Sequence, residues 1–129
     1  MDRGAEQSVL PYAEREGIGV IVYSPMGSGL LTGGITRERI EAMPEDDWRK
    51  TDPRFTEPLL SQHLALGARL RAVAARQGTT PGAVAVAWTL RNPAVDGAIT
   101  GFRRADQVDP ILAAANLELT DQDIAEIER

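Results

Sequence analysis

The sequence has no cysteine, a single histidine and a single lysine among its 129 residues. Without cysteine the chain has no disulfide, no thiolate metal site and no cysteine nucleophile, and this absence fits a reducing compartment. The lone histidine, His63, has no carboxylates near it at metal-ligand spacing, and the sequence offers no base for a nucleophilic serine. The sequence therefore predicts neither a metal site nor serine hydrolase chemistry.

The chain also lacks an excess of positive charge, a long apolar run and a leader-like N-terminus. Its formal net charge is −5 at pH 7, whereas nucleic acids and anionic membrane surfaces attract basic proteins. No run of about 18 apolar residues could cross a bilayer, and residues 1–6 lack the apolar core of a signal peptide. These absences predict a cytoplasmic protein that binds neither nucleic acid nor membrane.

What is present is the composition of an ordered globular protein. A hydrophobic fraction of 43% and a charged fraction of 26% in 129 residues predict one domain, residues 1–129, with one core. Two short apolar runs, 18–23 and 95–100, predict strands, and the first reads as buried on both faces. Apolar periodicity and capping residues predict helices over 7–16, 37–43, 62–77, 81–91, 105–115 and from 121 onward. This order is typical of part of a parallel α/β barrel.

Three details of these helices depend on single residues. Ser61 is predicted to cap the helix over 62–77, because serine accepts hydrogen bonds from the first N–H groups of a helix. Leu112 and Ile124 are predicted to face inward from the last two helices.

A loop rich in turn residues, 24–33, follows the first strand. Its glycines allow the backbone to approach a ligand closely, and ligands of α/β proteins sit at the carboxyl ends of parallel strands. The alternative is an ordinary strand-to-helix connection. The polar segment 34–60 is long for a connection in a compact domain. It is interpreted either as a flap over a ligand, held down by Trp48 or Phe55, or as a solvated excursion.

Two segments resemble a known family. Residues 23–33, Tyr-Ser-Pro-Met-Gly-Ser-Gly-Leu-Leu-Thr-Gly, resemble the seventh-strand segment of the aldo-keto reductases. Residues 96–108, Asp-Gly-Ala-Ile-Thr-Gly-Phe-Arg-Arg-Ala-Asp-Gln-Val, resemble the family's eighth strand and its cofactor-clamping turn. The resemblance implies the C-terminal part of a TIM (β/α)8 barrel, from its sixth helix to its eighth helix plus a closing helix. It also implies reduction of an aldehyde or ketone to an alcohol with NADPH.

The resemblance assigns cofactor-binding roles to ten residues. By this resemblance Tyr23 stacks on the nicotinamide, and four residues of the loop 24–33 hold the pyrophosphate. Five residues of the turn within 96–108, the second turn, hold the adenosine end. The ten are Tyr23, Ser24, Met26, Gly27, Ser28, Gly101, Phe102, Arg103, Arg104 and Gln107. Without the family, Tyr23 reads more often as a core aromatic, and Arg103 and Arg104 read as solvated side chains at a helix start.

The sequence departs from the family in three ways. Pro110 and Ile111 stand where many members carry an acid and an asparagine that hold the adenine, and Gly34 stands where some members carry a lysine. The motifs of the catalytic aspartate, tyrosine, lysine and histidine are absent, so no catalytic residue is assigned. The general acid of the family is that tyrosine, whose pKa the lysine tunes.

Two readings follow. In the first, the chain is an oxidoreductase segment that binds NADP(H), acts on a small carbonyl substrate only within a longer protein, and is inactive alone. In the second, it is a truncated, non-catalytic remnant that binds a nucleotide or a protein. Two strands cannot close a barrel, so self-association through exposed strand edges is also expected.

Overall fold

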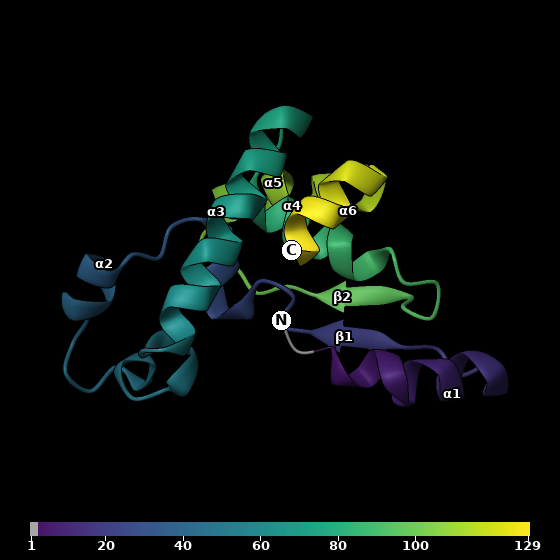
Figure 1. The fold of residues 1–129 in the computed structure, drawn as a ribbon, viewed down its shortest axis with the longest axis horizontal. Helices are drawn as coiled ribbons and strands as arrows, with labels where there is room; N and C mark the ends of the chain where they lie inside the picture. The colour runs from purple at the N-terminus through teal and green to yellow at the C-terminus, as the bar shows by residue number, and fades with distance from the viewer. Residues whose placement is uncertain (1–2) are drawn as a thin grey trace.

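The computed structural model describes residues 3–129 as a helix-rich α/β fold with one small sheet (Figure 1). The helices and strands are α1 (Val9–Glu16), β1 (Ile21–Tyr23), α2 (Arg37–Glu41), α3 (Leu59–Gln77), α4 (Pro81–Leu90), β2 (Gly97–Ile99), α5 (Val108–Leu112) and α6 (Asp121–Glu128). Short 3-10 helices lie between them, among them Gly27–Thr32, Trp48–Lys50 and Pro53–Phe55. The predicted order of helices and strands is confirmed.

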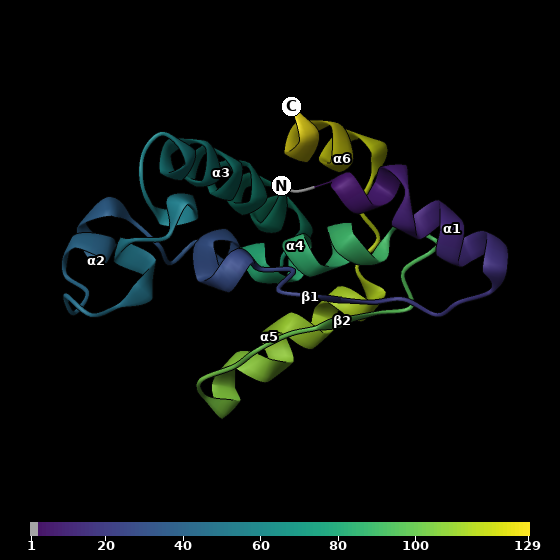
Figure 2. The same cartoon turned by 90° about the horizontal axis from the view of Figure 1, so that it is seen from below.

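The two strands are parallel and adjacent. Tyr23 pairs with Ile99, and Asp96 extends the pairing because its N–H donates to the Val20 carbonyl, 2.8 Å away, while its carboxylate accepts the Val20 N–H at 2.6 Å. The α3 and α4 helices form the crossover between the strands. Figure 2 shows the two strands running side by side.

The faces of this sheet differ from the prediction for the first strand. Alternate residues of a strand point to opposite faces, and Val22 packs in a cluster with Leu10 of α1. On the other face Ile21 is 67% exposed, Tyr23 82% and Ile99 56%. The prediction that the strand is buried on both faces was therefore wrong. No third strand covers or extends the sheet within residues 3–129.

The main core lies between α3, α4 and the segments packed on them. The predicted apolar stripe of α3 is confirmed at Leu66, Leu70, Val73 and Ala74, all of which are buried. Residues 82–87 of α4 are buried on every side, as its nearly unbroken apolar sequence predicts. This helix therefore lies between layers, as expected.

Capping residues fix most helix ends where the sequence predicts them. Thr36, Thr80 and Thr120 each accept an N–H from the third residue of the helix that follows. Gly17 and Gly78 take the left-handed conformation that ends α1 and α3, each with φ of 64°.

Two local predictions were wrong, and a third is confirmed only in part. The α3 helix begins at Leu59, and Ser61 lies inside it, where its N–H and hydroxyl both donate to the Glu57 carboxylate at 3.2 and 2.7 Å. Glu57 therefore takes the capping role given to Ser61. Leu112 is 61% exposed, and Ile124 is only half-buried.

The last helix is joined to α3 by a buried carboxylate. Asp123 is 1% exposed, and its Oδ1 accepts bonds from Arg76 Nε and Nη2 at 3.2 and 2.6 Å. Its Oδ2 accepts bonds from Gln77 Nε2 at 2.6 Å and from the Thr120 N–H and hydroxyl at 3.1 and 2.8 Å. Burial raises the pKa of the Asp123 carboxyl, but these hydrogen bonds outweigh burial and hold the pKa well below its usual value.

A second polar cluster joins the two ends of the described chain. Arg3 Nη1 lies 3.0 Å from Glu128 Oε2, and Glu128 also accepts bonds from the Trp88 indole, at 3.0 Å, and from Arg91. The guanidinium groups of Arg3 and Arg91 lie 5.5 and 5.0 Å from the centroid of the Trp88 ring. The interaction of these cations with the aromatic ring is favourable.

No helix within residues 3–129 is long and apolar enough to cross a membrane.

Candidate functional site

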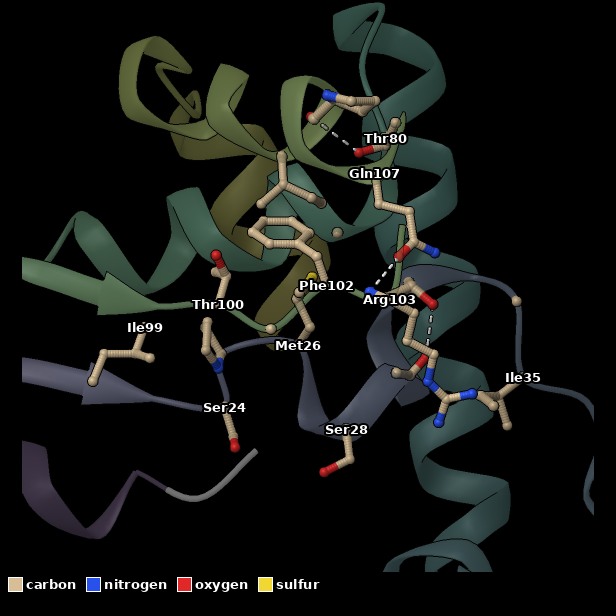
Figure 3. Close-up of a pocket in the computed structure, with 18 of the residues that line it drawn as sticks. Ser24, Met26, Ser28, Ile35, Thr80, Ile99, Thr100, Phe102, Arg103 and Gln107 are labelled. Atoms are coloured by element: carbon tan, nitrogen blue, oxygen red, sulfur yellow. Dashed lines mark hydrogen bonds between the residues drawn. The ribbon is translucent and has the colours of Figure 1, made fainter. Parts of the chain in front are cut away.

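A pocket of about 740 Å³ lies where the two strands end. Its walls come from the end of β1 and the loop after it, from the turn after β2, from the start of α4, and from the segment 34–60. The carboxyl ends of parallel strands are where α/β proteins bind ligands, and this volume lies within the usual range for small-molecule sites. Figure 3 shows Met26 from the first loop and Phe102 and Gln107 from the second segment drawn together around this pocket.

The first loop holds its shape at some cost in backbone energy. Ser24 and Ser28 have φ of 53° and 55°, a left-handed conformation that residues other than glycine rarely adopt. Each such residue costs on the order of 1–3 kcal/mol, and such strain clusters at ligand sites. The buried Leu30 and Leu31 anchor the loop in the core. The chain therefore maintains an unfavourable loop conformation at the pocket wall.

The second turn is organised by Gln107. Its Oε1 accepts the N–H groups of Arg103 and Arg104 at 2.9 and 3.2 Å. The Gln107 side chain therefore occupies both of these backbone N–H groups. Gln107 is thus a structural residue of the turn as well as a lining residue of the pocket.

The pocket brings together eight of the ten residues that the resemblance selects. They are Tyr23, Ser24, Met26, Ser28, Gly101, Phe102, Arg103 and Gln107. Gly27 is not in the lining, and its N–H donates to the Ser24 carbonyl at 2.9 Å within the loop. Arg104 is not in the lining either, and it pairs with Asp106 at 3.0 Å. Cofactor binding by any of the ten stays a prediction.

Residues of the segment 34–60 also line the pocket, among them Trp48, which the sequence suggested as an anchor of a flap, and Arg39 and Arg49, which it did not single out. Trp48 packs edge-on against Phe55, with ring centroids 5.6 Å apart, and Phe55 is 1% exposed. Phe55 therefore holds the segment to the core, while Trp48, Arg49 and Arg39 reach the pocket wall. The only sequence signal for this was the length of the connection with its two aromatic residues.

The electrostatics of the wall favour an anion. Arg49 forms two hydrogen bonds to Asp47, at 2.8 and 2.5 Å. These bonds, with the Arg49 N–H and the charge of Arg103, lower the pKa of the Asp47 carboxyl to about 2. The carboxylate is therefore ionised at neutral pH and neutralises Arg49. Arg39 and Arg103 line the pocket and form no ion pair within residues 3–129, although the Asp47 carboxylate lies near enough to Arg103 for their charges to interact.

Helix α4 sets how closely the two halves of the pocket approach. A Cβ atom at Gly82 would lie 2.6 Å from Ile111 Cδ1 and 3.2 Å from Met26 Sδ. The Thr80 hydroxyl donates to the Pro110 carbonyl at 3.5 Å, which links the start of α4 to α5. Met26 belongs to the first loop and Ile111 to α5, so the lack of a side chain at Gly82 lets both pack against the same helix.

Three other titratable residues, His63, Lys50 and Tyr12, do not line the pocket. His63 lies on α3 with its Nδ1 3.0 Å from the Arg54 carbonyl, and Lys50 pairs with Glu45 at 2.7 Å. Tyr12 lies on α1 beneath Arg15. Within residues 3–129 no group of three or more His, Asp or Glu side chains is placed to hold a metal ion. The arrangement therefore suits binding of an anionic ligand.

Comparisons with known proteins identify the family. A model of the Aldo/keto reductase family matches residues 1–129. The chain is 33% identical to the aldo-keto reductase YhdN of Bacillus subtilis (strain 168) over 127 residues, which is 98% of this chain and 38% of that protein. The structure superposes on the glycerol dehydrogenase AKR11B4 of Gluconobacter oxydans with a TM-score of 0.86 and 32% identity, covering 98% of this chain and 38% of that one. The chain thus spans less than half the length of these relatives, and it belongs to the aldo/keto reductase family.

Proposed function

We propose that the chain forms the last two strand–helix units of an aldo-keto reductase barrel and contributes the binding site for NADP(H). In this assignment β1 and β2 are the seventh and eighth strands, and residues 1–129 form one domain. The pocket at the strand ends is the observation that supports the proposal. It gathers residues from both segments that resemble the family, 23–33 and 96–108, and its lining includes the side chains of Arg39 and Arg103.

The residues fit a dinucleotide phosphate. The first loop offers hydroxyl groups on Ser24 and Ser28 at the pocket wall, and arginine side chains bind phosphate through forked N–H donors. Tyr23 is 82% exposed at the end of β1, so its ring face is open to stack on a planar group. The bound cofactor would supply the hydride that reduces an aldehyde or ketone in the whole protein.

The chain alone is proposed to bind without turnover. The family motifs for the catalytic aspartate, tyrosine, lysine and histidine do not occur in its sequence. An assay of NADPH oxidation with a reactive aldehyde should therefore give no rate above a buffer blank. A steady-state rate that the Tyr23→Ala variant abolishes would contradict this.

A calorimetric titration with NADPH, repeated with NADH, tests the binding proposal. We expect micromolar binding that is tighter for NADPH, because Arg103 adds a cation for the extra phosphate. Arg103→Ala should weaken NADPH binding more than NADH binding. Arg15→Ala, on the outer helix α1 and paired with Glu16, is the matched control and should bind as the unchanged chain does. No binding by a folded sample would refute the proposal.

The open sheet face favours a second role, in protein association. Ile21, Tyr23 and Ile99 form an exposed row on β1 and β2, and the outer edges of both strands are unpaired within residues 3–129. Exposed strand edges and apolar faces promote pairing with another chain. Self-association through these edges is therefore proposed alongside nucleotide binding.

A further inference from the structure

We propose that Arg39 is the cation that holds the diphosphate of the nucleotide, in the place of the lysine that some members of the family carry at the position of Gly34. This inference rests on the proposed nucleotide site. It assigns a role to a residue of the segment 34–60 that neither the sequence patterns nor the resemblance selected.

The position of the Arg39 guanidinium carries the inference. Its Nη1 donates to the Gly34 carbonyl at 2.8 Å. The same Nη1 atom lies 3.3 Å from the place where a Cβ atom at Gly34 would be, so the guanidinium occupies the start of the path that a side chain at 34 would follow. Both residues line the pocket. A positive charge is thus present beside position 34 although the residue there has no side chain.

The other arginines of this segment are not available in the same way. Arg37 pairs with Glu57 at 2.7 Å, and Arg54 pairs with Asp52 at 2.7 Å. Arg49 is neutralised by Asp47. Arg39 contacts a carbonyl oxygen and no carboxylate among the described residues, so its charge is left for a ligand. In a chain of net charge −5, an unpaired cation at a pocket wall favours an anionic occupant.

The neighbours of Arg39 point to the diphosphate rather than to the adenosine end. Gly34 directly follows the first loop, whose residues Ser28, Gly29 and Thr32 line the same pocket. Arg103 lies on the separate turn after β2. Binding of the diphosphate, which NADPH and NADH share, should therefore depend on Arg39, whereas binding of the additional phosphate of NADPH should depend on Arg103.

Calorimetric titration of Arg39→Ala with NADPH and with NADH tests the inference. Removal of one charged hydrogen-bond donor is expected to weaken the affinity for NADPH and for NADH by a similar factor of about ten. This factor is at the lower end of the range for charged contacts because the Arg39 side chain is exposed. Raising the salt concentration should weaken dinucleotide binding by the unchanged chain more than binding by the Arg39→Ala variant. Arg37→Ala, two residues earlier and outside the pocket lining, is the matched control and should bind both dinucleotides normally.

A charge transplant separates the role of the cation from that of the arginine itself. In Arg39→Ala the space beside position 34 is open, so Gly34→Lys in that background should restore most of the lost affinity for both dinucleotides. Arg39→Gln should behave like Arg39→Ala, and circular dichroism should show all variants folded. If the unchanged chain binds neither dinucleotide, the proposed function fails and this inference with it. If it binds and Arg39→Ala binds equally well, or loses affinity for NADPH alone, only the inference is overturned.

Discussion

Replacement of Asp123 by asparagine should destabilise the protein far more than its size suggests. The two carboxylate oxygens accept five hydrogen bonds from Arg76, Gln77 and Thr120. An asparagine amide would place an NH₂ group at one of these oxygen positions, and either position faces N–H donors. The substitution therefore removes charged hydrogen bonds and also places the amide NH₂ group against other N–H donors, at a residue that is 1% exposed.

The expected loss in free energy of unfolding is on the order of 3 kcal/mol. Breaking a buried ion pair from one side costs roughly 3–5 kcal/mol. The lower end applies because Arg76 has 42% of its side chain exposed and keeps Glu126 as a partner at 2.8 Å. For a chain of this length, such a loss should lower the midpoint of thermal unfolding by about 10 °C. Asp121→Asn is the control, because Asp121 is exposed in the first turn of the same helix and should cost only about 0.5 kcal/mol through the helix dipole.

The pH dependence gives an independent readout. The pKa of Asp123 is lower in the folded chain than its value of about 3.9 when unfolded, so its contribution is fully present above about pH 4. It is lost as the pH falls through the folded pKa. The stability difference between the unchanged chain and Asp123→Asn should therefore be constant from pH 5 to 8 and shrink at lower pH. Urea unfolding followed by circular dichroism measures it. Equal stability of the Asp121 and Asp123 variants at pH 7 would refute the reasoning.

Two further predictions concern packing and association. Gly82→Ala should weaken NADPH binding, measured by calorimetry, because the new Cβ would displace Ile111 and Met26 at the pocket. The loss in free energy of unfolding should be no more than about 1 kcal/mol, because both displaced groups are ends of flexible side chains. In the control Gly67→Ala, in α3, the new Cβ has its nearest contact at 3.5 Å, so this variant should be more stable by about 0.5 kcal/mol and should bind NADPH normally. Thermal unfolding and titration would contradict this if Gly67→Ala lost more stability and more NADPH affinity than Gly82→Ala. Size-exclusion chromatography with light scattering should show self-association that Ile99→Lys abolishes and that Arg15→Ala leaves unchanged, whereas a monomer at all concentrations would count against the open-edge reading.

Features set by neighbouring residues were predictable from the sequence. Thr36, Thr80 and Thr120 cap their helices because a threonine hydroxyl reaches an N–H only three residues ahead. The stripe of α3 follows from helical spacing alone. The grouping of Met26 with Phe102 and Gln107 was reached through family resemblance, and the structure places all three at one pocket.

Features set by contacts distant in sequence were not predictable. Ile21 and Tyr23 have the composition of a buried strand, but their exposure depends on whether further strands are present. Asp123 reads as an exposed acid of a first helical turn, and only its contacts with Arg76 and Gln77, more than forty positions earlier, bury it. Arg39 reads as one of several surface arginines, because the pairing of Arg37 with Glu57 depends on a fold that brings the residues together.

The contact between Arg3 and Glu128 has a consequence for protein engineering. Because these side chains touch at 3.0 Å, the two ends of the described chain lie within reach of a short peptide linker. Domains with adjacent ends tolerate circular permutation when the new ends fall in exposed loops. Joining the ends and opening the chain within 44–46, where the residues are exposed, would leave α3, α4 and both strands continuous. Such a permuted chain would carry the segment with Trp48 and Arg49 at its new start, where tags and fluorophores could report on the pocket directly.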